Sequence, residues 1–433
     1  MKSYILFSGL AVLVLYWASD WITFEVLEPK PSSIKNIHIV ETDDDEISAF
    51  VVFPVGNTPP HEMHYVEHLV WLNSIKSSSG NVDSHSNAWT NSHSVGYWLS
   101  GPSGDLFDLL NKLSGVFSPI ELQRDFAEQE KNIILREREF WKVGDIREIA
   151  NEEMNAFLYQ NNSIATSVTG DSAQIADLDF DRARKLHLAT HKPDTATIIV
   201  IGGVSEKQTH RVLQKQDWIK PKDIRQTQPL RFNLSGIAEK AFQYPNQNTA
   251  PTLIWRHVVT LPESIQYDLL DAQTLLIGDI LGSSLTGGLA APLHYDAAIA
   301  RSFDFEIWPL DEDNVEIRFI GSPDQGVSLS QLQGAFEDTF SKITTDGIPE
   351  QTFNQVFNRF EADWPDWNDD TETSHWRADY VLRSTSVLRM PLPTSAVRAL
   401  KAQLSLDSTN GLLRSLGAEG RTSVALIGPK ERF

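Results

Sequence analysis

The sequence predicts an α+β protein that is built from two tandem, homologous domains. Its 433 residues are about three times the usual length of one domain, and its 41% hydrophobic content can fill more than one core. Runs rich in β-branched residues alternate with helical patterns, in the same order in both halves of the chain. Each half also ends on a short β-branched run that closes in glycine, at residues 195–203 and 422–428. This repetition indicates an internal duplication.

The first thirty residues form a separate segment. Lys2 precedes an uncharged, apolar run from Tyr4 to Trp17, and Asp20 ends it. A run of this length is typical of the apolar part of a signal peptide and is short for a membrane span of about 20 residues. We therefore predict a signal peptide or an N-terminal membrane anchor over residues 1–30, with a buried N-terminal helix as the alternative. Either form of export places the remaining chain on the periplasmic side of the inner membrane.

The first domain is expected over residues 31–220. Its β-rich runs Ile37–Glu41 and Ile47–Phe53 flank an acidic turn, which predicts a hairpin. Pro59 and Pro60 then open a helix that continues to about Ser74, since proline is tolerated in a first helical turn. Extended segments follow at residues 87–99, and helical periodicity appears at 105–117, 121–142, 152–158 and 180–191.

A linker is expected over residues 221–248, because this stretch is rich in Lys, Gln, Pro and Asn and has no sustained periodicity. The second domain, residues 249–433, repeats the order of the first. It begins with a strand and a long helix, continues with two strands and two helices, and ends on the strand at 422–428. The expected ranges are 251–259, 266–281, 302–308, 315–321, 328–344 and 349–364.

Charge and composition exclude several functions. The net charge of −21 argues against binding to nucleic acid, because duplex binding needs a basic face. The acidic balance also argues against electrostatic attachment to anionic lipids, so membrane attachment would have to be apolar. The chain contains no cysteine, which excludes disulfides, thiol catalysis and cysteine-ligated metal sites. A transition metal must therefore be held by histidine and carboxylate side chains.

The helix that opens at Pro59 carries the pattern H-x-x-E-H, as His64-Tyr-Val-Glu67-His68. Residues i and i+4 lie on one helix face, so both imidazoles can reach one ion, and Glu67 shares that face. Neutral imidazoles suit zinc, and a carboxylate beside the metal can take a proton from water. The pattern predicts a zinc site; the alternative is an exposed polar helix face with coincidental histidines.

A catalytic zinc needs a third protein ligand and one open position. The helix expected at 121–142 offers Glu128, and Glu121 lies seven residues before it. Both would share a pocket with Glu67 if this helix packs beside the zinc helix. Glu130 is about 200° from Glu128 in helical phase and is expected to point elsewhere. The alternative for this acidic helix is a solvated face.

Four ordered segments resemble the pitrilysin/insulinase family of zinc metallopeptidases, which includes the mitochondrial processing peptidases and short bacterial members. The first segment is the inverted zinc motif, and the second, Asn87-Ala-Trp-Thr90, resembles the N-A-x-T strand of the family. Residues 127–137 resemble its E-x-E-x-x-(I/V)-(I/L) helix, and residues 191–203 resemble the segment that closes its first domain. The resemblance covers residues 33–205 and, more loosely, 250–433.

The resemblance implies two processing-peptidase-like domains, each a mostly antiparallel sheet packed with helices, of which only the first holds zinc. It assigns His64, His68 and Glu128 as zinc ligands, Glu67 as the general base and Glu121 as a further acidic residue near the site. The implied reaction is hydrolysis of a peptide bond by a zinc-activated water, with Glu67 passing the proton to the leaving amine.

The resemblance also assigns a substrate strand. Asn87, Ala88 and Thr90 are implied to hold an extended peptide by strand addition, which reads the main chain more than the side chains. We therefore expect peptides or unfolded segments of varied sequence as substrates.

Two departures from the family pattern matter. The interval from His68 to Glu128 is shorter than is usual in the family. Catalytically complete members also carry R-E-x-x-G-L-A-Y in the second half, whose Arg and Tyr contact the substrate. The matching stretch here begins at Pro292 and has His294 at the Arg position and Arg301 at the Tyr position. Loss of such donors can cost about 10²–10³ in rate.

Some short family members work as heterodimers, in which one subunit brings zinc and the other brings the Arg/Tyr pair. We therefore predict a zinc-dependent endopeptidase subunit that needs a second family subunit for full activity. A homodimer, or replacement of the pair by His294 and Arg301, is the second option. The alternatives from other classes are a catalytically weak or inactive peptide-binding or assembly subunit of a peptidase complex, and a metal-binding module without hydrolysis.

Overall fold

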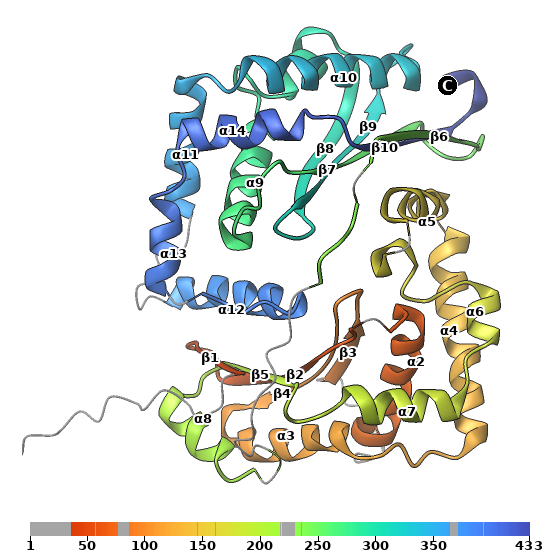
Figure 1. Ribbon diagram of the computed structural model, residues 1–433, viewed down its shortest axis with the longest axis vertical. Helices are drawn as coiled ribbons and strands as arrows, with labels where there is room; N and C mark the ends of the chain where they lie inside the picture. Colours follow the sequence, from red (N-terminus) through yellow and green to blue (C-terminus); the bar gives the residue numbers. More distant parts are fainter. Residues whose placement is uncertain are drawn as a thin grey trace, which may run out of the picture.

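The protein folds into two halves, which lie one above the other in Figure 1. The computed structural model describes residues 36–56, 58–76, 86–144, 146–160, 162–216, 218, 230–234, 236–363, 371–392 and 394–433. The segment 1–30, for which we predict a signal peptide or anchor, lies outside these residues. Within the described ranges no helix is both long and apolar enough to cross a membrane.

The first half is built on a five-stranded sheet in the order β1-β5-β2-β4-β3. β1 and β5 are parallel, and the other three strand pairs are antiparallel. The main core of this half lies between the sheet and helices α2, α3 and α4. The elements are β1 (Ile37–Glu41), β2 (Glu46–Pro54), α2 (Pro60–Val70), β3 (Ser86–Thr90), β4 (Ser94–Pro102), α3 (Leu106–Leu113), α4 (Arg124–Gly144), α5 (Ile146–Tyr159), α6 (Ser172–Ala176), α7 (Phe180–Thr190), β5 (Thr197–Gly202) and α8 (Glu206–Leu213).

β1 and β2 do not form the predicted hairpin. β5 lies between them, parallel to β1 and antiparallel to β2. Its apolar, β-branched sequence suits a strand that is covered on both faces. The acidic turn passes over the end of β5, and Gly202 and Gly203 permit this close approach. A Cβ atom at Gly202 would lie 2.2 Å from the carbonyl oxygen of Glu46, and one at Gly203 would lie 1.9 Å from that of Asp44.

The second half repeats this arrangement, with the strand order β6-β10-β7-β9-β8. Again the first and last strands along the chain are parallel and the other pairs are antiparallel. The prediction of two tandem homologous α+β domains is therefore confirmed. The elements are β6 (Ala238–Pro245), β7 (Thr252–Thr260), α9 (Tyr267–Gly282), β8 (Ala300–Pro309), β9 (Asn314–Pro323), α10 (Leu329–Asp346), α11 (Glu350–Asp363), α12 (Thr371–Ser386), α13 (Thr394–Lys401), α14 (Leu406–Leu416) and β10 (Arg421–Gly428).

Strand β6 lies inside residues 221–248, where we expected only a linker. It pairs with β10 along its whole length, so the second sheet begins at Ala238 rather than near residue 251. β6 is the outermost strand of its sheet, and its side chains are exposed or half-buried. Such a strand can be polar throughout, and it therefore lacks the apolar alternation by which strands are recognised.

One helix from each half packs on the sheet of the other half. α5 packs on the second sheet and α12 packs on the first, and the two helices occupy equivalent positions in the two element orders (Figure 1). The buried residues on the second sheet are Ala150 and Met154 of α5 with Ile254, Ala425 and Ile427. Those on the first sheet are Ala378 and Val381 of α12 with Val40, Val52 and Ile199.

A buried polar cluster ties α5 to the second sheet. Glu316 of β9 accepts hydrogen bonds from the hydroxyl of Tyr159 at the end of α5 and from the guanidinium of Arg256 on β7. Arg421 of β10 donates to two main-chain carbonyls in the last turn of α5. These carbonyls would otherwise lack partners, because a helix leaves its last carbonyl groups unpaired.

Candidate functional site

Helix α2 carries the H-x-x-E-H motif. Its apolar side chains are buried in the core of the first half, which fixes the helix against the sheet. The Nε2 atoms of His64 and His68 lie 3.2 Å apart. The structure thus brings both imidazoles to one point, as their spacing on a helix requires.

A carboxylate of α4 meets the two imidazoles at this point, and it belongs to Glu137. Its Oε2 atom lies 3.5 Å from Nε2 of His68 and 3.8 Å from Nε2 of His64. One ligand atom from each of the three residues lies within 4.8 Å of the other two. Within the described ranges, this is the group of histidine and acidic side chains that could hold a metal ion.

Glu128, which we predicted to be the third ligand, lies elsewhere. Its side chain is 49% exposed and forms an ion pair with Lys131 at 2.9 Å. Glu128 and Glu137 are nine residues apart, which is two and a half helical turns, so they lie on opposite sides of α4. Glu121 is exposed and precedes α4, which begins at Arg124. The prediction of Glu128 as the third ligand is therefore wrong, because the residue beside the histidines is Glu137, nine positions further along α4.

Glu130 takes the place that we had given to Glu121. It lies seven residues before Glu137, it is 7% exposed, and its Oε2 atom is 2.9 Å from Nδ1 of His68. A carboxylate that binds the second nitrogen of a metal-binding histidine fixes the orientation of the ring. The hydroxyl of Tyr65 also donates to the carbonyl of Ala127 at 2.9 Å and joins α2 to α4.

The sequence contained a signal for the correct register. Ala127, Glu130 and Ile134 are buried on α4, at intervals of three and four residues, and Glu137 continues this series. The apolar members of the series, Ala127 and Ile134, indicate the inner face of the helix from the sequence pattern alone. Glu128 is one residue away from that series, and hence about 100° away from that face.

The three side chains fit a zinc ion. Two imidazole nitrogens and one carboxylate oxygen form a donor set that is typical of catalytic zinc sites. Donor atoms about 2.0–2.1 Å from a tetrahedral ion are about 3.4 Å from one another. The separations found here are 3.2, 3.5 and 3.8 Å, so small side-chain movements suffice to bind the ion.

Burial controls the ionisation of the motif. It lowers the pKa of His64 to about 4, and the neighbouring His68 acts in the same direction. Burial also disfavours the charged form of His68, but hydrogen bonds to Glu130 and Glu137 raise the pKa of that imidazole above its ordinary value. The pKa of Glu67 rises to about 7 because of burial, against the opposing effects of His68 and of a hydrogen bond from Thr90.

Thr90 holds the carboxylate of Glu67 in place. Its hydroxyl donates to Oε2 of Glu67 at 2.7 Å. Thr90 is the last residue of β3, which is the outermost strand of the first sheet. Among the described residues, one edge of β3 beside the motif has no partner strand, and Asn87 is exposed and Ala88 half-buried there.

The turn after β3 is held by the other half. Asn91 donates to the carbonyl of Ser386 at 3.3 Å, and the hydroxyl of Ser94 donates to the same carbonyl at 2.8 Å. Ser386 ends helix α12. The position of Thr90, and with it that of Glu67, thus depends on a helix from the second half.

The two altered family positions belong to the second half. His294 is exposed, and its Nδ1 atom lies 2.8 Å from the carbonyl oxygen of Ala300 within the second half. Arg301 is exposed on β8. In the part of the chain that the structure describes, His294 is not a member of the group formed by His64, His68 and Glu137.

Comparisons of the sequence with known proteins give distant relatives. No family model matches the chain. The beta subunit of the mitochondrial-processing peptidase of Neurospora crassa is 21% identical over 159 residues, which are 35% of this chain and 33% of that protein. Subunit 1 of the human mitochondrial cytochrome b-c1 complex is 23% identical over 200 residues, 43% of this chain and 41% of that protein. The chain thus matches less than half the length of these curated relatives.

Solved structures share the whole fold. The periplasmic protease PqqL from Escherichia coli matches with a TM-score of 0.74 and 12% identity, over 92% of this chain and 47% of that one. A putative M16-like peptidase from Alicyclobacillus acidocaldarius matches with a TM-score of 0.70 and 15% identity, over 91% and 96% of the two chains. The chain has the fold of M16 peptidases. This shared fold and the sequence similarity to the processing-peptidase subunit confirm the resemblance predicted from the sequence.

The M16 fold occurs both with and without activity. An inactive M16 peptidase domain from Pseudomonas fluorescens matches this chain with a TM-score of 0.71 and 14% identity, over 92% of this chain and 96% of that one. The M16 fold alone therefore leaves the activity of this chain to be argued from its site residues.

Proposed function

We propose that the chain is the zinc-bearing subunit of an M16-type endopeptidase that hydrolyses peptides or unfolded segments. The observation that carries this proposal is the meeting of His64, His68 and Glu137 at one point beside the buried carboxylate of Glu67. The three side chains would hold zinc. When bound there, zinc supplies Lewis acidity, which polarises a carbonyl and makes a water molecule more acidic.

The chain's own residues supply the remaining functions. One oxygen of Glu67 accepts the hydrogen bond of Thr90, which leaves the other free to take a proton from the attacking water and pass it to the leaving amine. A pKa near 7 suits a group that must both accept and release a proton at neutral pH. The free edge of β3 binds the substrate as an added strand, through Asn87, Ala88 and Thr90.

The proposed enzyme has a partner subunit. His294 and Arg301 stand at the positions where the family pattern has Arg and Tyr. The names of the two relatives describe subunits of larger assemblies. We therefore place the missing pair on a second family subunit. The proposed location is outside the cytoplasm, which the apolar run from Tyr4 to Trp17 supports.

The test of the proposal is replacement of Glu67 by glutamine. An endopeptidase should keep one zinc per chain in this variant and lose turnover by a factor of about 10² or more, because the general base is gone. Metal content by mass spectrometry and hydrolysis of an internally quenched peptide measure the two effects. A wild-type chain without zinc under metal-replete conditions would overturn the proposal.

The second candidate function is a peptide-binding or assembly subunit with little or no catalysis. The altered positions His294 and Arg301 favour it, and so does the fold that the chain shares with an inactive M16 domain. For such a subunit, wild-type chain and the Glu67→Gln variant should bind peptide equally and neither should cleave it.

The hydrogen bond from Thr90 leads to a further prediction. Replacement of Thr90 by valine should lower kcat about tenfold or more with little change in KM, since Glu67 loses the group that orients it. The Thr90→Ser variant keeps a hydroxyl and should retain most of the activity. Zinc content should be the same in both variants. Equal losses in the valine and serine variants would argue against an orienting role.

A further inference from the structure

A cavity of about 440 Å³ lies between the two halves, and the functional roles given above do not use it. His93 and Ile164 line it from the first half. The second half contributes the start of α9, the end of β8 and the last turn of α12 with Val387. The cavity is therefore formed only when both halves are in place.

The cavity begins close to the proposed catalytic residues. His93 is three residues beyond Thr90, whose hydroxyl bonds to Glu67, so the two residues are no more than about 11 Å apart along the chain. Ser386 also lines the cavity, and its carbonyl accepts the hydrogen bonds from the turn that contains His93. The cavity wall and the β3 edge are thus held in one fixed arrangement.

The walls suit a large apolar group. The aromatic rings of Phe232, Tyr267 and Trp308 and the side chains of Leu310 and Val387 line the space. The ring of Trp308 is 51% exposed, so it is available to contact a ligand. Aromatic and aliphatic walls of this kind favour an apolar side chain over a hydrated polar one.

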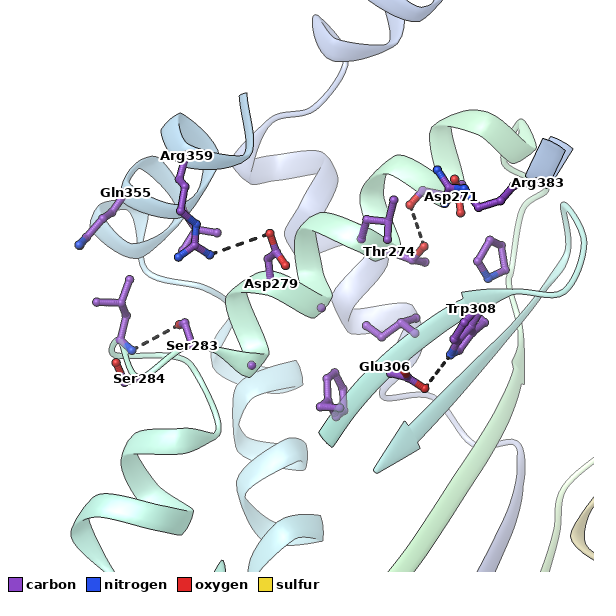
Figure 2. A pocket seen from close by; sticks show the side chains of 18 residues that line it. Asp271, Thr274, Asp279, Ser283, Ser284, Glu306, Trp308, Gln355, Arg359 and Arg383 are labelled. Carbon is purple, nitrogen blue, oxygen red and sulfur yellow. Dashed lines mark hydrogen bonds and ion pairs between the residues drawn. The ribbon is translucent and has the colours of Figure 1, made fainter. Parts of the chain in front are cut away.

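Three acidic side chains of the wall have partners within the protein. Asp268 accepts a hydrogen bond from the hydroxyl of Tyr380 at 2.7 Å, and Glu316 is bound by Arg256. Asp271 faces Arg383, as Figure 2 shows. Arg318 also lines the space, and its Nε atom has no partner among the described residues. An uncharged side chain leaves the partners of the three carboxylates in place, whereas a cation would compete with them.

The cavity is open rather than sealed. It shares Asp271, Trp308, Pro309 and Arg383 with a larger cavity of about 830 Å³ on the second half. In Figure 2 Asp271, Arg383 and Trp308 lie at one end of this larger space, and Ser284 and Gln355 lie at the other. A side chain can therefore enter from a peptide that lies outside, and the chain of that peptide can continue past the opening.

We propose that the cavity between the halves is a subsite for one large apolar side chain, aromatic or aliphatic, of a peptide bound along β3. Because His93 is at most about 11 Å from Thr90, we expect this side chain within about four residues of the bond that is cleaved. The proposal rests on the proposed function, because it takes β3 as the strand that binds substrate.

The test compares two internally quenched peptides that have a Gly/Ser background and differ only in one Phe or Ser. The full wild-type chain should cleave the Phe peptide about tenfold more efficiently, the factor expected when a large side chain is partly buried. Mass spectrometry of the products should place the cut two to four residues from the Phe. Equal cleavage of both peptides would overturn the proposal.

Two variants of the cavity act in opposite ways on its volume. Trp308→Ala removes a wall and Val387→Phe fills the space, and each should abolish the preference for Phe, so that the ratio of Phe-peptide to Ser-peptide cleavage falls to about one. The matched control is Phe107→Ala, because Phe107 is 45% exposed on α3 and does not line the cavity. A preference for Phe that persists in both cavity variants would overturn the subsite.

Binding separates this inference from the proposed function. If the wild-type chain binds no zinc, the proposed function fails, and fluorescence anisotropy of a labelled Phe peptide then tests the subsite alone. The same binding test applies if the chain cleaves peptides only together with its partner subunit. A loss of affinity of about tenfold in Val387→Phe, with none in Phe107→Ala, would support the subsite without catalysis. Equal affinities in these proteins would overturn it.

Discussion

The Glu137→Gln variant is expected to lose its zinc, and the Glu128→Gln variant is expected to keep one zinc per chain. Glu137 provides the carboxylate oxygen that lies beside both imidazoles, whereas Glu128 points away from them and pairs with Lys131. A neutral amide is a poorer ligand than a carboxylate for a divalent ion. We expect the zinc affinity to fall more than about a hundredfold, beyond the 10–100-fold usual for loss of a residue that only orients a ligand.

The two variants are well matched, because both change one glutamate of the same helix to glutamine. Glu130→Gln should give an intermediate loss, since Glu130 orients His68 without contacting the ion. Metal analysis after dialysis and competition with a chromophoric chelator measure the affinities. Loss of zinc in the Glu128 variant together with retention in the Glu137 variant would show that Glu128, and not Glu137, is the third ligand.

Replacement of Glu316 by glutamine is expected to destabilise the protein by about 3–5 kcal/mol, the usual cost of leaving a buried charge without its partner. Arg256 is only 2% exposed and depends on Glu316, which also accepts the hydroxyl of Tyr159 from the other half. Denaturant unfolding followed by fluorescence measures the change. Glu306→Gln is the control, because Glu306 is 47% exposed and its weak pairing with Arg318 should contribute less than about 1 kcal/mol.

The effect of Glu316 should depend on pH. Burial alone would raise its pKa, but the guanidinium groups of Arg256 and Arg318 hold the pKa of Glu316 below the ordinary value of 4.5. A carboxyl group whose pKa is lower in the folded state binds fewer protons there than in the unfolded state. Its stabilising effect is complete above the unfolded pKa and is lost as the pH falls through the folded pKa. The difference between wild type and Glu316→Gln should therefore shrink in acid; a difference that stays constant from pH 7 to pH 3 would contradict this account.

The zinc motif could be predicted because its geometry is local. His64 and His68 need only one helix turn to meet, and the proline at the start of α2 marks that helix in the sequence. The third ligand comes from α4, and its identity depends on which face of α4 meets α2. Helical phase excludes most residues of α4 as the third ligand. The choice between Glu128 and Glu137 depends on the inner face of α4, which Ala127 and Ile134 mark.

The fold shows the same division between local and distant information. Local sequence patterns predict the repeated order of strands and helices, and this repetition predicts the two domains. The position of β5 between β1 and β2 depends on pairing over about 150 residues, which no local pattern reports. The edge strand β6 lacks the apolar alternation of other strands, because its side chains are exposed or half-buried along its whole length. We did not predict helices α12, α13 and α14, although Leu412, Leu413 and Leu416 of α14 are buried at helical spacing.

The exchange of α5 and α12 between the halves bears on the ancestry of the molecule. A half-length ancestor with this fold would have left one face of its sheet bare until a second copy supplied the missing helix. Two such copies, each giving its helix to the other, make a symmetric swapped dimer. Joining them end to end would keep every contact, and only one copy would then need the residues of the proposed zinc site. The present chain has this form, with the histidine pair in its first half.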